Sequence, residues 1–275
     1  MKFDLALPSL LLIITLASTI LYPRFKERFS SILGQTKLRI RDIAIMVVIM
    51  GAAVALIAFI PQLVILVFFS ASYMLVLFTF AYALTKKWYI AACVSTLYIL
   101  AYAYLWNTVF LNLFTVTLAI LIATFIGSSL SWKTSAVFAC LLTAMDVFQV
   151  FGTRFMVVSA EKLIALRLPV AVILPMFPSS GKIVLGLGDL FLAGVLAIQV
   201  FEKYGLKTGL ASTGVSALVF LTEESLLLNS GIDFFPATIM VAAGWLTSLG
   251  AIKAHTHLRR SIRSITAESP PKQSA

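Results

Sequence analysis

The chain has 275 residues, of which 61% are hydrophobic and only 12% are charged. Soluble domains are about half apolar and a quarter charged, so this composition excludes a soluble globular protein and predicts an all-α polytopic membrane protein. The formal net charge of +10 is spread between apolar segments, which argues against nucleic acid as a partner. Cys93 and Cys140 both lie within apolar segments, so a disulfide scaffold is excluded as well.

Nine segments are apolar and about 20 residues long, the length that crosses the hydrocarbon core as a helix. In chain order they are Leu5–Tyr22, Ile43–Ile60, Leu63–Leu84, Trp88–Trp106, Thr108–Gly127, Thr134–Thr153, Ile183–Phe201, Thr208–Thr222 and Phe234–Ile252. Pro61 separates the second from the third, and Asn107 separates the fourth from the fifth. The eighth segment has only 15 residues, and Glu223-Glu224 directly after it is interpreted as the membrane boundary.

The basic residues indicate how these segments are oriented. Most of the 21 lysines and arginines follow odd-numbered segments or lie in the tail after Ile252, and loops rich in Lys and Arg lie on the cytoplasmic side. We therefore predict a multi-pass protein of the cell membrane with its N-terminus outside and its C-terminus in the cytoplasm. One lysine precedes the first segment and six basic residues follow it, which is typical of a retained anchor.

Asp146 and Asp189 are the acidic residues that lie within predicted spans. An acidic group at the centre of a spanning helix costs about 2.5–3.5 kcal/mol, and it normally faces a partner or a cavity. Each aspartate is 12 residues from the cytoplasmic end of its span, about 18 Å at 1.5 Å per residue. We therefore expect the two carboxyls to lie at one depth on neighbouring antiparallel helices.

Two facing carboxyls share one proton, because both cannot ionise at short range. One can then act as general base and the other as general acid, so that a water is activated for attack on a peptide carbonyl. The alternative for each aspartate is a protonated carboxyl that forms a hydrogen bond between helices. Gly186 and Gly188, beside Asp189, either let a substrate backbone approach or serve ordinary packing between helices.

Three pieces of sequence resemble the GxGD intramembrane aspartyl protease family of presenilin and signal peptide peptidase, most closely the archaeal type. Met145–Thr153 resembles the signal peptide peptidase segment that begins Tyr-Asp and ends Val-Phe-Gly-Thr. Gly186-Leu187-Gly188-Asp189 matches the GxGD motif, and Pro236-Ala237-Thr238 resembles the Pro-Ala-Leu motif. Their order and their positions on spans six, seven and nine fit the nine-helix family architecture.

The resemblance implies an enzyme that cleaves transmembrane helices of membrane proteins or signal peptides within the lipid bilayer, with preference for substrates whose N-terminus is cytoplasmic. It implies no cofactor or metal, and it leaves oligomerisation open. The implied regions are a five-helix scaffold (1–133), four catalytic helices (134–252) and a cytoplasmic tail (253–275). The implied catalytic residues are Asp146 and Asp189, and the implied substrate-binding residues are Gly186, Leu187, Gly188, Pro236, Ala237 and Thr238. Met145 and Thr238 depart from the tyrosine and leucine of the family.

The segment Glu161–Lys182 joins the two aspartate-bearing spans on the outer side. Its three prolines exclude a regular spanning helix, so we expect either an interfacial lid or a loop along the headgroups. Lys182-Ile183-Val184-Leu185 is typical of a strand and is a candidate to pair with an unwound substrate. The loop is short compared with that of presenilin-type enzymes, so we predict a chain that remains uncut.

Other functions would need other residues. A metalloprotease needs a pattern such as His-Glu-x-x-His, whereas His255 and His257 lie in the predicted tail. Ser216 has no histidine within a span to act as its base, so it is interpreted as a packing residue. The main alternative is a proton- or cation-coupled transporter or channel with paired intramembrane carboxylates. A non-catalytic chaperone of membrane helices is the third hypothesis.

Overall fold

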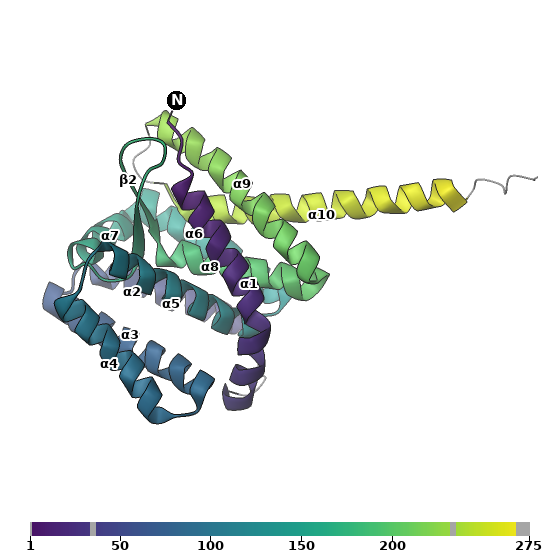
Figure 1. The fold of residues 1–275 in the computed structure, drawn as a ribbon. Helices are drawn as coiled ribbons and strands as arrows, with labels where there is room; N and C mark the ends of the chain where they lie inside the picture. Colours follow the sequence, from purple (N-terminus) through teal and green to yellow (C-terminus); the bar gives the residue numbers. More distant parts are fainter. Residues whose placement is uncertain (1, 34–36, 232–234, 268–275) are drawn as a thin grey trace, which may run out of the picture.

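A computed structural model describes residues 2–33, 37–231 and 235–267. This part of the chain forms ten α-helices, a π-helical segment and a two-stranded sheet (Figure 1). In chain order the elements are α1 (Ala6–Leu33), α2 (Ile40–Ile57), α3 (Gln62–Thr85), α4 (Trp88–Tyr104), α5 (Thr108–Ser129), α6 (Trp132–Val147), η1 (Phe148–Thr153), α7 (Phe155–Ala165), β1 (Ala171–Pro175), β2 (Lys182–Gly186), α8 (Leu187–Tyr204), α9 (Leu206–Ser230) and α10 (Ala237–Ala267).

Seven of the described helical segments are long and apolar enough to cross a membrane: those of α1, α2, α3, α5, α6 with η1, α9 and α10. Helix α4 is apolar but has only 17 residues. Helix α8 has 18 residues and carries Asp189, Glu202 and Lys203. The chain is therefore an α-helical multi-pass membrane protein.

Three helices extend well past the ends predicted from hydropathy. Helix α1 continues through Pro23 to Leu33, α9 continues through Glu223 and Glu224 to Ser230, and α10 continues to Ala267. The apolar segments end at Tyr22, Thr222 and Ile252 because charged residues follow them, but the helices continue because Arg, Lys and Glu are good helix formers.

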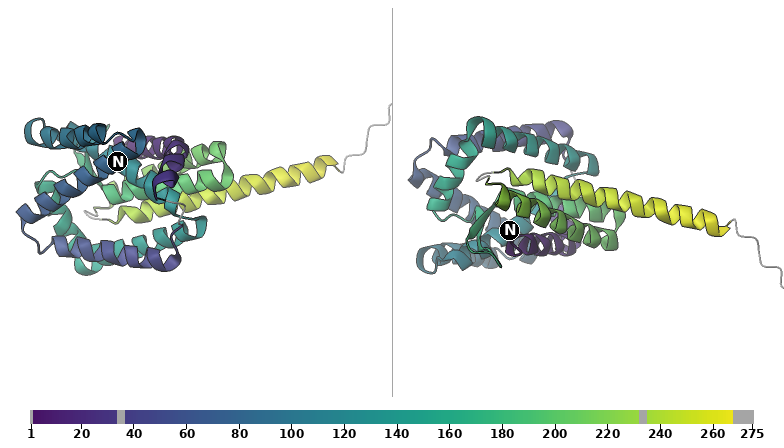
Figure 2. Two further views of the ribbon diagram at one scale, coloured as in Figure 1. Left: turned by 90° about the horizontal axis from the view of Figure 1, so that it is seen from below. Right: turned by 90° about the horizontal axis from the view of Figure 1, so that it is seen from above.

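The described part of the predicted tail, 253–267, belongs to α10, which projects beyond the other helices (Figures 1 and 2). The remaining tail residues, 268–275, and Phe234, the predicted start of the ninth span, lie outside the described residues.

Helix α8 is the centre of the bundle, since every residue from Asp189 to Val200 is buried. Helices α1, α5, α9 and α10 all pack against it, while α3 and α4 pair with each other at one edge of the molecule (Figure 1). A Cβ added at Gly194 would lie 2.7 Å from the Ala123 Cβ of α5 and 2.9 Å from the Ser18 Oγ of α1. Small residues thus let three helices approach closely, as is usual between membrane helices.

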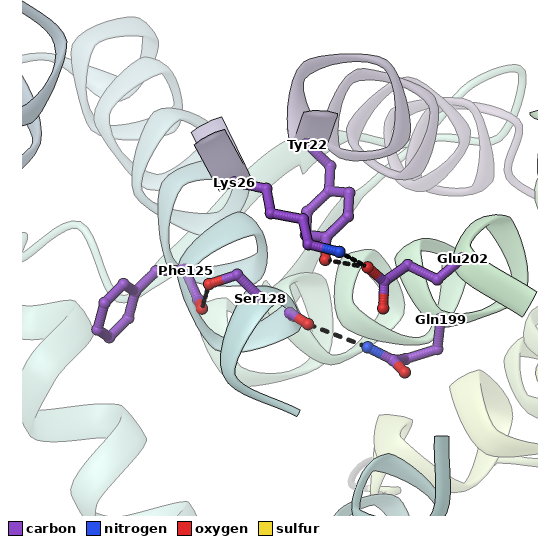
Figure 3. A network of polar contacts seen from close by, with 7 residues as sticks. Tyr22, Lys26, Phe125, Ser128, Gln199 and Glu202 are labelled. Carbon is purple, nitrogen blue, oxygen red and sulfur yellow. Dashed lines mark hydrogen bonds and ion pairs between the residues drawn. The ribbon is translucent and has the colours of Figure 1, made fainter. Parts of the chain in front are cut away.

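Polar contacts hold the C-terminal part of α8 to α1 and α5 (Figure 3). The Tyr22 hydroxyl donates to Glu202 at 2.6 Å, and Lys26 forms an ion pair with the same carboxylate. The Gln199 side chain donates to the Gly127 carbonyl of α5 at 3.0 Å. These contacts fix the axial position of α8 relative to its two neighbours.

The β1–β2 hairpin lies at the other end of α8, which we call the hairpin end of the bundle. The strands are antiparallel, with Ala171 opposite Gly186. The Asn112 side chain of α5 accepts a hydrogen bond from the Ile173 N–H and donates one to the Ile173 carbonyl, both at 2.8 Å. The expectation that no regular spanning helix occupies 161–182 is confirmed, because only the 11-residue α7 and this hairpin form there.

The N-terminal residues tie the hairpin to α1 and α9. The Asp4 carboxylate accepts from the backbone N–H groups of Ala6, Leu7 and Phe177 at 2.8–3.1 Å. The Asn229 side chain of α9 accepts from the Lys2 N–H and donates to its carbonyl. Asp4 is 0% exposed, and its three hydrogen bonds replace the solvation that a carboxylate would have in water.

We expect Asp4→Ala to lower the free energy of unfolding by about 2 kcal/mol or more, because it removes a helix cap and leaves the partly buried Phe177 N–H without this acceptor. Chemical unfolding of the detergent-solubilised protein measures this. Asp42→Ala is the matched control, since Asp42 caps the start of α2 at a partly exposed position. Equal losses in the two variants would contradict the bridging role of Asp4.

Candidate active site

Asp146 lies where the helical geometry of the sixth span changes. Helix α6 begins with a capping box between Ser131 and Thr134, and it ends one residue after Asp146. The backbone continues as the π-helical η1, a rare geometry that is frequent at functional sites. The sequence predicted one helix from Thr134 to Thr153, so this change of geometry is an addition from the structure.

Helix α2 supports this irregular stretch. The Gln149 side chain of η1 donates to the Gly51 carbonyl of α2 at 2.7 Å. A Cβ added at Gly51 would lie 2.3 Å from the Met145 sulfur. Gly51 therefore permits Met145 and Gln149 to pack closely on either side of Asp146. The sequence analysis missed Gly51 and Gln149, because nothing in the local pattern links residues 98 positions apart.

Asp189 lies in the first turn of α8, directly after the strand that ends at Gly186. The predicted helical span from Ile183 is therefore wrong in its first four residues, which form β2. The β-branched Ile183 and Val184 favour a strand, and β1 supplies the partner backbone. The expectation of a strand over Lys182–Leu185 is confirmed.

The glycines of the GxGD segment have different surroundings. Gly186 is the N-cap of α8, and a Cβ added there would lie 3.1 Å from the Asp189 Oδ2. The carboxylate of Asp189 thus lies against the backbone of Gly186. A Cβ added at Gly188 would meet no atom within 4 Å, so this position borders open space. Leu187 is partly buried and packs against the core.

The structure brings Asp146 and Asp189 together. Their side chains are only 6% and 5% exposed, and the two carboxyls are close enough to interact electrostatically. The Asp189 Oδ1 is buried and has no hydrogen-bond partner. Two carboxyls at short range share a proton, which is the arrangement required for paired acid and base catalysis.

The third sequence piece reaches the same place. Pro236 is buried directly before α10, and Ala237 and Thr238 open that helix. The Thr238 side chain is 1% exposed and lies near the Asp146 carboxyl, and its buried hydroxyl has no hydrogen-bond partner.

A further buried carboxyl, missed by the sequence analysis, lies on α9. Glu224 is 3% exposed, and neither of its carboxylate oxygens has a hydrogen-bond partner. It interacts electrostatically with Asp4. Glu224 therefore faces the protein interior. Its burial depends on the N-terminal segment, which no local pattern reveals.

The remaining candidates lie elsewhere. His255 and His257 are exposed on α10, and no group of three or more His, Cys, Asp or Glu in the described residues could hold a metal ion. Ser216 packs against α10, because a Cβ added at Gly244 would lie 3.0 Å from the Ser216 carbonyl oxygen.

A comparison with models of known protein families finds no match for this chain, and a comparison with curated proteins finds no similar sequence. The resemblance to GxGD proteases therefore rests on three short motifs.

We expect Gly51→Ala to lower the free energy of unfolding by about 1 kcal/mol or more, because the added methyl group overlaps the Met145 sulfur. A double-mutant cycle with Met145→Ala measures the coupling, which should reach about 0.5 kcal/mol or more. Strictly additive effects would contradict a direct clash.

We expect Glu224→Leu to raise the free energy of unfolding, because it removes an unpaired buried carboxyl and keeps a side chain of similar size. Chemical unfolding at neutral pH measures the change. Glu161→Leu, at an exposed position on α7, is the control and should have little effect. A loss of stability in Glu224→Leu would show that the carboxyl has a partner that stabilises it.

Proposed function

We propose that the chain is an intramembrane aspartyl protease of the GxGD type, which hydrolyses peptide bonds within transmembrane helices of membrane proteins or signal peptides. The observation that carries this proposal is the meeting of Asp146 and Asp189, two buried carboxyls from α6 and α8, beside the start of α10. All three sequence pieces that resemble the family converge on this place.

In this proposal the membrane is crossed nine times. Helices α4 and α8 would join the seven helical segments that are long and apolar enough on their own. Asp189 would then be tolerated on α8 because it faces the protein interior, and Glu202 because it lies near the end of the helix. Ionisable residues of membrane helices usually occupy such positions. The hairpin end, where the N-terminal residues lie, would be outside, and the projecting end of α10 would be cytoplasmic, in agreement with the basic residues.

The proposed chemistry needs only the two aspartates and a water. The ionised carboxyl takes a proton from the water as it attacks the peptide carbonyl, and the protonated carboxyl donates its proton to the carbonyl oxygen. Collapse of the tetrahedral intermediate then breaks the C–N bond, with a proton passed to the leaving nitrogen. The low solvent exposure of the pair strengthens each electrostatic interaction in this sequence.

A helical substrate must unwind before its peptide bond can be attacked, because its carbonyls are shielded by helical hydrogen bonds. We propose that the exposed edge of β2, three to seven residues before Asp189 in the chain, pairs with the unwound segment. Open space at Gly188 would receive the substrate backbone beside the carboxyl. Irregular backbone inside a membrane is tolerated only where protein covers it.

The surroundings of the pair support a protease over a transporter or channel. A proton or cation relay needs polar groups along its route. Between Asp189 and Gln199, α8 carries only apolar residues and Gly194, and all of them are buried. Helix α8 itself therefore provides no polar side chain that could continue a route from the pair to Gln199.

We expect Asp146→Asn and Asp189→Asn each to lower cleavage of a fluorogenic transmembrane peptide by about a thousandfold or more in detergent, because either change removes one half of the acid–base pair. An inhibitor that mimics the tetrahedral intermediate should block the unmodified protein. Glu224→Gln is the matched control, since it neutralises a buried carboxyl elsewhere and should leave cleavage within about threefold. Ion flux in liposomes that requires either aspartate, with no cleavage product, would contradict the proposal.

A further inference from the structure

Three side chains that follow Asp146 in the chain donate hydrogen bonds to backbone carbonyls of α2. In chain order the pairs are Gln149 with Gly51 at 2.7 Å, Ser159 with Val54 at 2.7 Å, and Lys162 with Ile57 and Ala58. The accepting residues are three or four positions apart, so their carbonyls follow one side of α2. A backbone carbonyl has two lone pairs and can accept such a donor in addition to its helical bond. We call these contacts the carbonyl ladder of α2.

The ladder holds the chain on both sides of a break in the helix. Arg154, between η1 and α7, has a left-handed backbone conformation with a φ of 57°. Gln149 lies before this residue, whereas the other two donors lie after it. Gln149 and Ser159 are only 6% and 1% exposed, so solvent does not compete for their bonds. The ladder therefore fixes η1 and α7 to the same helix.

Gln149 is the ladder residue nearest in the chain to the candidate catalytic carboxyl, since it lies three residues after Asp146. Met145, directly before Asp146, lies against the same point of α2. A Cβ added at Gly51 would be 2.3 Å from the Met145 sulfur and 3.3 Å from the Gln149 Nε2. The backbone on both sides of the carboxyl is thus held against Gly51. Because a carbonyl only accepts, the Gln149 amide must present its NH₂ group to it.

Asp146 needs this support because of where it lies. Helix α6 ends one residue later, and the backbone continues with the rare π-helical geometry of η1. Regular α-helical bonds therefore do not continue past the carboxyl to fix its direction. Asp189 differs, because it lies on α8, which is buried along its length up to Val200. The bond from Gln149 to α2 supplies the first carboxyl with a hold from outside its own helix.

We propose that Gln149 is a positioning residue, whose bond to the Gly51 carbonyl holds the π-helical turn and so keeps the Asp146 carboxyl directed toward Asp189. This inference rests on the proposed protease function and deepens it. The other two bonds of the ladder lie farther along the chain and hold α7. The motif resemblance assigned no role to Gln149, which acts here through the backbone and not by contact with substrate.

The first test is cleavage of the fluorogenic transmembrane peptide by Gln149→Met and Gln149→Leu. Both variants keep a side chain of similar volume and lose the donor. A catalytic group displaced by about 1 Å can lose about a hundredfold in rate. We therefore expect kcat to fall by about tenfold to a hundredfold, with KM changed less than about twofold.

Ser159→Ala is the matched control. It also removes one buried bond to a carbonyl of α2, so its loss in free energy of unfolding should be similar to that of Gln149→Met. Because Ser159 lies after the break at Arg154, kcat should remain within about threefold of the unmodified protein. A difference in kcat at similar stability separates a positioning role from a purely structural one.

Three results would overturn the inference. Full kcat in Gln149→Met and Gln149→Leu would show that the bond to Gly51 is dispensable. An equal fall in kcat in Ser159→Ala would show that the ladder acts through stability alone. A raised KM at unchanged kcat in Gln149→Met would show that Gln149 contacts substrate.

A second test does not need activity, so it separates this inference from the proposed function. Infrared spectroscopy of the purified protein identifies the carboxyl band that disappears in Asp146→Asn. We expect that band to shift in Gln149→Met and to keep its position in Ser159→Ala, even if no substrate is cleaved. An unchanged band in Gln149→Met would overturn the inference whatever the cleavage assay shows.

Discussion

The burial of α8 is the constraint on which the rest of the structure depends. This helix carries one of the two paired carboxyls, yet it is surrounded by α1, α5, α9 and α10. Close packing at Gly194 and Gly127 brings α1 and α5 near its axis, and the Glu202 and Gln199 contacts fix it lengthwise. Asp189 is held firmly because its helix has little freedom to slide, tilt or rotate.

Both carboxyls lie where the backbone changes its geometry. Asp189 follows the change from β2 to α8, and Asp146 precedes the change from α6 to η1. Such junctions leave backbone groups that a membrane cannot satisfy, so they must lie inside protein. Surrounding protein also lowers the polarity near the carboxyls. Around the hairpin, this cover is held by the contacts of Asn112 with Ile173 and of Asp4 with Phe177.

The candidate site draws on helices from the whole chain. Helix α2 supports η1 through Gly51, α5 holds β1 through Asn112, and Asp4 holds the hairpin tip. A division into a scaffold of residues 1–133 and a catalytic region of 134–252 follows the order of the motifs along the chain. In space, α1 and α5 lie directly against α8 and take part in positioning its carboxyl.

Local sequence by itself determined the membrane class and several helices almost to the residue: the predicted Leu63–Leu84 corresponds to α3 at Gln62–Thr85. It also led to the expected meeting of Asp146 and Asp189, because residue spacing along helices gives depth directly. Hydropathy and helical rise depend only on residues within one continuous segment of the chain, so the sequence can express them. Tertiary structure alone decided the rest: the pairing that makes 182–186 a strand, the burial of Asp4 and Glu224, and the approach of Gly51 to Met145 and Gln149. Each of these depends on a partner far away in the chain, and no local pattern carries that information.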